Sequence, residues 1–197
     1  MNYNELSDTA KERAFRDFQN RDMYDSIYAY WVFDDWVERL EDVGITTSPD
    51  QMIYSGFHSQ GDGASFEGSI NLKKFLEAHP DVRQKHIELY ISTIPFDMLS
   101  DDYAEYYGVN LTRFGGSHYS HEYTVHIGSW ELDCAFEKRE YFEGLMMQAE
   151  PDILEQCREH MRSLYNDLQN AYEHEIGLDS FLEGVEYQDF NEDGSLS

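Results

Sequence analysis

Apolar residues recur at helical spacing near the N-terminus of the chain. The pattern predicts a helix within residues 6–18, with Ser7 or Asp8 as its N-cap. A second helix is predicted from about residue 24 to residue 43, and Gly44 is its expected stop. The residues expected on the buried sides are Ala10, Ala14, Phe15 and Phe18 in the first helix, and Ile27, Trp31, Phe33, Trp36, Val37 and Leu40 in the second.

The longest helical pattern lies in the C-terminal third. It predicts a helix from Pro151 to about Glu175, with Pro151 near the first turn, where its missing N–H costs no hydrogen bond. A short helix around residues 178–184 and an extended tail are expected to follow. The apolar face of the long helix consists of Ile153, Leu154, Cys157, Met161, Leu164, Tyr165, Leu168 and Tyr172.

The middle of the chain alternates β-forming segments with polar loops. Residues 51–57 and 64–70 are predicted to form two strands joined by one loop, and residues 109–114 and 122–132 a second antiparallel pair. The segments between the two pairs are a short helix 71–80 closed by Pro80, a stretch 85–93 with both strand and helix character, and a helix 100–108 stopped by Gly108.

Together these elements predict an α+β fold. An antiparallel sheet of two hairpins, with about four strands, packs against several helices that include the long C-terminal one. A chain of 197 residues can bury a substantial core and fits a single domain, residues 1–197. Its expected parts are a helical region 1–45, a hairpin-rich region 50–135, a helical region 150–185 and an acidic tail 186–197.

Charge changes this picture from a generic domain to an unusual one. Forty acidic residues against 14 lysines and arginines give a formal net charge of −26 and a pI near 4.3. Such a surface repels nucleic acid and anionic lipid, so direct nucleic-acid or membrane binding is not expected. Two explanations of the negative charge remain: it keeps the protein soluble, or it attracts a partner with a basic surface. No lysine or arginine follows Arg162, and the candidate partner face consists of Asp167, Glu173, Glu175, Asp179, Glu183 and Glu186.

Two further features bear on location. No run of about 18 apolar residues exists, and the N-terminal residues lack the apolar core of a secretory signal. The two cysteines, Cys134 and Cys157, fit no metal-binding spacing and no disulfide scaffold, so we interpret them as reduced thiols. A cytoplasmic protein is the expectation.

The polar loop "YSGFHSQGDGASFEG", residues 54–68, invites comparison with nucleotide-binding loops. Gly56 and Gly61 have the glycine spacing of a P-loop, but Asp62-Gly63 stands where lysine and serine or threonine are required. The third glycine of a dinucleotide-binding fingerprint is also missing. A carboxylate at the centre of a phosphate site would oppose the ligand, so both nucleotide motifs are rejected.

As a hairpin turn the same loop needs only Asp62-Gly63, because both central residues of a tight turn have positive φ. The additional polar residues Ser59, Gln60 and Ser65 exceed that need. They make the loop the best candidate for a ligand site.

A second polar loop, residues 113–123, supplies a possible partner cluster. It contains His118, His121 and Glu122. Arg113 is the nearest cation that could meet a phosphate, and Tyr119 or Tyr123 could stack on a base. If the two loops converge, these residues and those of the first loop form one small-ligand pocket.

Metal and catalytic interpretations are weaker. His118 and Glu122 would share a face of a strand, but a metal would need a further ligand such as Asp62, and no helical H-E-x-x-H motif exists. A serine nucleophile with His121 and Asp62 would lack the G-x-S-x-G elbow. Residues 189–194 match half of a calcium loop without its bidentate glutamate, so a tail turn is expected. No metal, cofactor or catalytic residue is predicted.

Four segments taken together carry a family resemblance: "LSDTAKERAFRDF", "YSGFHSQGDGASFEG", "GSHYSHEY" and "YQDFNEDGS". In this order they resemble a group of small bacteriophage and prophage proteins commonly labelled as an antitoxin of a toxin–antitoxin stability system. Where this chain has His58, that group usually carries a tryptophan. The resemblance implies a phage origin and action in the host cytoplasm, and it carries over no catalytic residues.

Two functional hypotheses follow. The first is a non-enzymatic binding protein that neutralises a host factor with a basic surface, as an antitoxin or an anti-defence inhibitor, with DNA or RNA mimicry as its concrete form. The second is a small-ligand protein, either a sponge for a nucleotide signal or a hydrolase, with its pocket at the 54–68 and 113–123 loops. The pattern does not indicate an oligomeric state.

Overall fold

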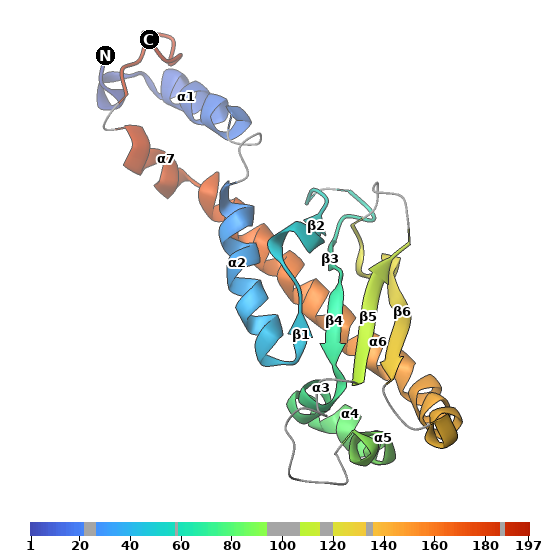
Figure 1. The fold of residues 1–197 in the computed structure, drawn as a ribbon. Coiled ribbons are helices and arrows are strands. Elements are labelled where there is room, and N and C mark those ends of the chain that lie inside the picture. Colours follow the sequence, from blue (N-terminus) through green and yellow to red (C-terminus); the bar gives the residue numbers. More distant parts are fainter. Residues whose placement is uncertain (22–26, 58, 94–106, 115–119, 133–135, 186–187) are drawn as a thin grey trace. The chain divides into compact units, whose positions relative to one another are not determined.

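The computed structural model describes the chain except residues 22–26, 58, 94–106, 115–119, 133–135 and 186–187. The chain divides into two compact units (Figure 1). The terminal unit comprises Met1–Val32 and Asp167–Ser197, and the central unit comprises Phe33–Asn166. The single domain expected from the sequence stays a prediction.

The terminal unit joins the two ends of the chain. Helix α1 (Asp8–Arg21) confirms the first predicted helix, and the Ala10 amide donates to the Ser7 hydroxyl at 3.3 Å, as expected of an N-cap. It packs with α7 (Leu178–Val185), which confirms the predicted short helix. A short 3-10 helix, η1 (Tyr3–Glu5), precedes α1. One cluster of buried residues in this unit consists of Leu6, Ala10, Ala14, Phe181, Val185 and Phe190.

The C-terminal tail folds back onto this core. Gly194 has a φ of +86°, and a Cβ there would lie 2.1 Å from the Ala10 carbonyl oxygen, so the close approach requires glycine. Arg13 donates to Asp193 at 2.7 Å, and the N-terminal ammonium of Met1 donates to the Phe190 carbonyl at 2.8 Å. The Gly194 amide donates to the Asn191 carbonyl at 3.0 Å, which confirms the tail turn predicted at residues 189–194.

The central unit contains two antiparallel sheets, which confirms the α+β fold class. Strands β1 (Ile45–Thr46), β4 (Gly68–Asn71), β5 (Tyr107–Arg113) and β6 (Val125–Leu132) form a sheet in the order β1-β4-β5-β6. The other sheet is a hairpin of β2 (Met52–Tyr54) and β3 (Ala64–Phe66), preceded by the 3-10 helix η3 (Pro49–Gln51). The predicted strand 64–70 is thus split at Glu67, and each half pairs in a different sheet.

The four-stranded sheet has two unlike faces. Ile45, Ile70, Val109 and Trp130 are neighbours across the strands, and the first three are fully buried. One residue along each strand, the neighbours are Thr46, Ser69, Asn110 and Ser129, which must point to the opposite face. Helix α6 (Phe136–Glu175) lies behind the sheet in Figure 1, on the apolar side.

Three short helices follow β4: α3 (Leu72–Ala78), α4 (Pro80–Lys85) and α5 (Ile87–Ser92). The helix predicted at residues 71–80 is confirmed, and Pro80 also opens α4, where its missing N–H is not needed. The ambiguous stretch 85–93 is helical. The predicted helix 100–108 lies mostly outside the described residues, but Gly108 belongs to β5 and is not a helix stop.

The helices α2 (Ile27–Asp42) and α6 carry one correction each. Trp31, predicted on the buried side of α2, is 69% exposed, whereas Trp36 is 5% exposed. Helix α6 begins at Phe136, so Pro151 lies inside it and not in its first turn. The expected stop at Gly44 is confirmed, with a φ of +86°. On α6, Ile153, Cys157, Met161, Leu164 and Leu168 are fully buried, as predicted, and Leu154, Tyr165 and Tyr172 are partly buried.

Candidate functional site

The loop between β2 and β3, residues 55–63, does not contain the predicted tight turn. Gly61, and not Asp62-Gly63, has the positive φ, +95°. The Asp62 amide donates to the Ser59 carbonyl at 3.2 Å, so Gln60 and Gly61 are the central residues of the turn, and glycine suits its second position. The Ser59 amide in turn donates to the Asp62 carboxylate at 2.6 Å. Asp62 is thus the last residue of the turn, and not one of its central residues as predicted.

The structure brings the two polar loops together at Gly63 and His121. A Cβ on Gly63 would lie 3.1 Å from the Cα of His121, so a side chain here would require the backbone of the second loop to shift. Gly63 is also fixed by Ser55, whose amide donates to the Gly63 carbonyl at 3.0 Å and whose hydroxyl accepts from the Gly63 amide at 3.2 Å. The 54–68 and 113–123 loops therefore share one packed contact in the central unit.

The remaining candidate ligand residues are dispersed around that contact. Ser59 and Gln60 are exposed, whereas Ser65 is fully buried and its hydroxyl has no hydrogen-bond partner among the described residues. His118 and Tyr119 lie outside the described residues. The described residues, which do not include His118, contain no group of three histidine, cysteine, aspartate or glutamate side chains that could hold a metal ion.

Arg113, the predicted phosphate contact, is engaged by Glu67. The Arg113 amide and guanidinium donate to the two Glu67 carboxylate oxygens, each at 2.9 Å. The bond from the Arg113 amide is the main cause that holds the pKa of Glu67 below its usual range, and the guanidinium adds to it. A phosphate would have to displace this bidentate partner.

A charged cluster not anticipated from the sequence joins η5 (Glu122–Thr124) to α6. Glu122 contacts His121 at 3.0 Å and Arg162 at 3.7 Å. Arg162 also donates to Glu155 at 2.8 Å, and this bond is the main cause that lowers the pKa of Glu155. Arg158 contacts Glu155 at 3.4 Å. Because Glu122 and Glu155 balance the two arginines, the cluster offers no net positive charge to an anion.

Two aromatic contacts fasten the same loops to α6. The Arg158 guanidinium lies 4.8 Å from the centre of the Tyr123 ring, a cation–π distance. The Tyr165 hydroxyl donates to the Gly56 carbonyl at 2.9 Å, and burial, followed by the Asp62 charge, raises the pKa of Tyr165. The spacing Glu155, Arg158, Arg162 on one helix was the available sequence signal for the cluster.

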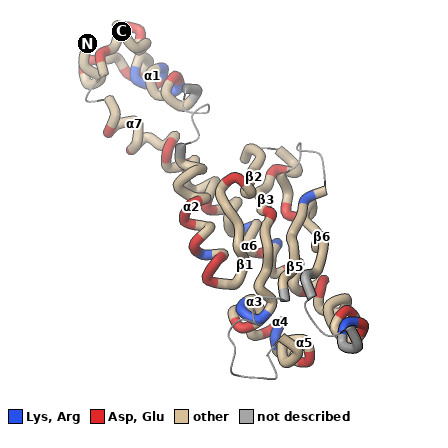
Figure 2. The backbone as a smooth tube through the Cα atoms, viewed as in Figure 1, with Lys and Arg blue, Asp and Glu red and all other residues tan. Residues whose placement is uncertain are grey.

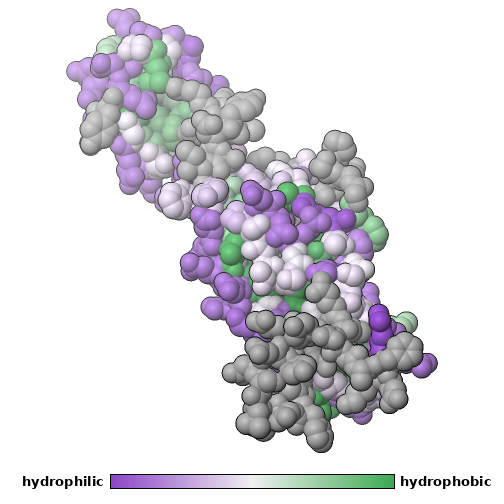
Figure 3. Space-filling model, viewed as in Figure 1, coloured by the Kyte–Doolittle hydropathy of each residue, from purple (hydrophilic) through white to green (hydrophobic). Residues whose placement is uncertain are grey.

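Two open grooves flank the four-stranded sheet. One, of about 490 Å³, lies on the polar face and is lined mainly by Thr46, Ser69, Asn110, Thr112 and Ser129. Figure 3 shows pale, near-neutral side chains on this side of the central unit. The other, of about 350 Å³, lies between β6 and α6 and is described below.

Acidic side chains are exposed in both units. In the terminal unit, Glu173, Glu175, Asp179 and Glu183 are exposed, Asp167 is partly buried, and Glu186 lies outside the described residues. In the central unit, α2 carries a second acidic surface, which was not predicted (Figure 2). We name it the α2 ridge; it consists of Asp34, Asp35, Glu38, Glu41 and Asp42, all exposed.

No helix in the described part of the chain has the length and apolar character to cross a membrane. Neither the curated proteins nor the solved structures contain a match to this chain. One family model matches residues 28–177, which include both polar loops, the whole of the four-stranded sheet and all of α6. The chain belongs to the family described as Domain of unknown function (DUF8835).

Proposed function

We propose that this chain is a non-enzymatic acidic binding protein that neutralises a host factor with a basic surface. In the form suggested by the phage resemblance, it acts in the host cytoplasm as an antitoxin or an anti-defence inhibitor. Mimicry of DNA or RNA is the physical mechanism. The observation that carries the proposal is the net charge of −26, together with the exposed acids of α2, where Arg39 is the one base, and of residues 173–183, which contain no lysine or arginine.

The α2 ridge supports mimicry by its spacing. Asp34, Glu38 and Glu41 are separated by four and three residues, so they lie on one face of the helix. With a rise of about 1.5 Å per residue, consecutive carboxylates are roughly 5–6 Å apart along the axis. Arg39 compensates one charge of the ridge through Asp35. A regular row of carboxylates on a rigid helix is what a groove built for a phosphate backbone would accept.

The small-ligand alternative has less support. Its phosphate contact, Arg113, is already held by Glu67, and the arginines of the η5–α6 cluster are balanced by carboxylates. The contact between the two loops is filled by backbone at Gly63. A nucleotide would therefore meet a site whose cations are occupied.

Two charge-neutralised variants test the proposal. One replaces Asp34, Glu38, Glu41 and Asp42 by their amides, and the other replaces Glu173, Glu175, Asp179 and Glu183. A control variant removes four acids scattered over the surface, Glu12, Asp50, Glu140 and Glu192, all exposed. Each variant changes the net charge equally, so a difference between them reports position and not total charge.

The measurement is capture from host lysate, quantified by mass spectrometry at low and high salt. We expect the native chain to enrich a basic protein that high salt releases. One of the two clustered variants should lose that protein, while the control keeps it. Equal retention by all four chains, or capture that salt does not weaken, would contradict the proposal.

A further inference from the structure

Strand β6 is at an edge of the four-stranded sheet. Within the part of the chain that the structure describes, it pairs with β5 on one side and with no strand on the other. An edge strand presents backbone N–H and C=O groups that another extended chain can pair with. β6 spans Val125–Leu132, which is long enough for several such bonds.

The edge is irregular at Gly128. Asn110 pairs with Ser129 and Leu111 pairs with Ile127, so Gly128 is the extra residue of a β-bulge. A Cβ at Gly128 would lie 2.6 Å from the Thr112 hydroxyl oxygen, so a larger residue would require the Thr112 side chain to move. The bulge lies at the groove between β6 and α6.

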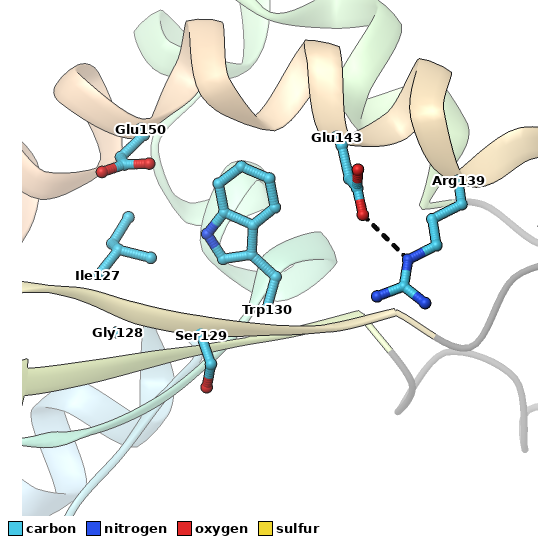
Figure 4. A pocket seen from close by; sticks show the side chains of 7 residues that line it. All are labelled: Ile127, Gly128, Ser129, Trp130, Arg139, Glu143 and Glu150. Atoms are coloured by element: carbon cyan, nitrogen blue, oxygen red, sulfur yellow. Dashed lines mark hydrogen bonds and ion pairs between the residues drawn. The ribbon is translucent and has the colours of Figure 1, made fainter.

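That groove, of about 350 Å³, has an aromatic side chain at its centre (Figure 4). Ile127 and Trp130 point from β6 toward α6. Along the axis of α6, the indole of Trp130 lies between Glu143 and Glu150. From α6, Arg139 donates to Glu143 at 2.9 Å. Glu150 has no ion-pair or hydrogen-bond partner among the described residues.

The charges of the groove select a cation. Because Glu143 neutralises Arg139, the half-buried carboxylate of Glu150 is the uncompensated group beside the Trp130 ring. Tryptophan is the best aromatic partner for a cation, and a carboxylate forms charge-assisted hydrogen bonds with a guanidinium. Arginine can stack on an indole and pair with a carboxylate at once, which lysine does less well.

We propose that an extended, arginine-bearing segment of the partner adds to the β6 edge and places its guanidinium between Trp130 and Glu150. This deepens the proposed function, on which it rests for the basic character of the partner. Backbone pairing along β6 supplies affinity, and the Trp130–Glu150 site supplies the preference for arginine. A second copy of this chain is a poorer occupant, because residues 125–132 contain no arginine or lysine to offer the site.

The probe is a capped pentapeptide, acetyl-Thr-Val-Arg-Val-Thr-amide, titrated into the full chain labelled with ¹⁵N. We expect shifts at the amides of Gly128 and Ser129 and at the indole N–H of Trp130. Replacing arginine by citrulline, which is neutral and of the same shape, should weaken binding about tenfold or more. Methylating the backbone nitrogens of the three central residues should abolish binding, because each edge of the peptide then carries a methyl group and cannot pair with β6.

Glu150→Gln tests the protein side. It should weaken binding of the arginine peptide about tenfold, whereas Glu140→Gln, an exposed acid of the same helix, should change it less than about twofold. Both variants should keep the native amide spectrum away from the groove. Three results would overturn the inference: no shifts on β6, equal effects of the two variants, or full binding of the N-methylated peptide.

The test is separable from that of the proposed function. The variants of the α2 ridge and of residues 173–183 leave the groove intact, so they should bind the pentapeptide normally. If the peptide binds but no salt-sensitive host partner is captured, the arginine site at β6 is supported and the proposed function is contradicted. If the partner is captured equally well by the Glu150→Gln variant, the proposed function is supported and the arginine site at β6 is contradicted.

Discussion

A pair of histidines predicts how the stability of the central unit depends on pH. His79 Nδ1 lies 2.8 Å from the Phe75 carbonyl, which can only accept, so Nδ1 carries the proton. In neutral His79, Nε2 is then an acceptor, and it lies 3.1 Å from Nε2 of His160, which must donate. Burial and the neighbouring His79 lower the pKa of His160 from 6.5 to about 4.

The sign of the effect follows from proton uptake. Between pH 6.5 and 4 the unfolded chain protonates His160 and the folded chain does not, so stability is highest above pH 6.5 and falls as the pH decreases. The slope for one group is about 1.4 kcal/mol per pH unit, which gives a loss of about 2 kcal/mol on going from pH 6.5 to pH 5.

The assay compares the native chain with His160→Gln. The amide can still donate to His79 but does not titrate, so the titratable groups that do not contact position 160 contribute equally to both proteins. Denaturant unfolding at pH 8 and pH 5 should show an additional loss of about 2 kcal/mol in the native chain. The same pH dependence in both proteins, or a smaller loss in the native chain, would refute the assigned tautomers and burial.

Three further predictions concern packing and burial. Gly63→Ala should lower the unfolding free energy by about 1–3 kcal/mol, because its Cβ meets the backbone of the second loop, whereas Gly144→Ala, in an open helical position, should raise it by up to about 1 kcal/mol. Thermal unfolding compares the two variants, and a Gly63→Ala variant more stable than the native chain would contradict the packing. Glu67→Gln should destabilise the chain by about 1–2 kcal/mol at pH 7. Because the folded-state pKa of Glu67 is lowered, the variant should also lose less stability than the native chain when the pH falls below about 4.5. Denaturant unfolding at pH 7 and pH 3 measures both effects, and the same acid dependence in both proteins would count against the Glu67–Arg113 pair. Burial raises the pKa of Cys157 to about 12, so in a Cys134→Ser background a thiol reagent should label the chain only on unfolding, and rapid labelling of the native state would show the site to be open.

Much of the fold could be read from local patterns, and the errors have physical causes. Trp31 and Trp36 are five residues apart, which places them about 140° apart around a helix, so they cannot share a buried face. Counting angles would have corrected the prediction. For α6, Pro151 was interpreted as a start signal, yet Phe142, Met146 and Ala149 extend the apolar stripe of the helix upstream of it.

The candidate site was less predictable because its contacts cross the sheet. The sequence suggested two local hairpins, whereas β4 pairs with β5, so Gly68 is opposite Leu111 and Glu67 can reach Arg113. A pattern of neighbouring residues cannot predict a hydrogen bond between two residues that are 46 positions apart in the sequence. Likewise, the approach of Gly63 to the second loop depends on the packing of β3 against η5.

The structure also explains how the four segments of the phage resemblance are related. The first and last pack together in the terminal unit, where Gly194 lies against Ala10 and Asp193 pairs with Arg13. The second segment packs against the described residues of the third in the central unit, at Gly63. Each pair builds part of the core or loops of its own unit, so the segments have a structural role whatever the partner is.

The central claim is that exposed carboxylates bind a basic surface, and the salt dependence of affinity tests it most directly. The measurement is the Kd of the native chain for the captured host protein from about 50 to about 500 mM salt, repeated with the variant that loses capture. We predict that Kd rises steeply with salt for the native chain, and that the neutralised variant binds more weakly with a shallower slope. A Kd that stays constant across this range, or the same slope in both proteins, would contradict the account.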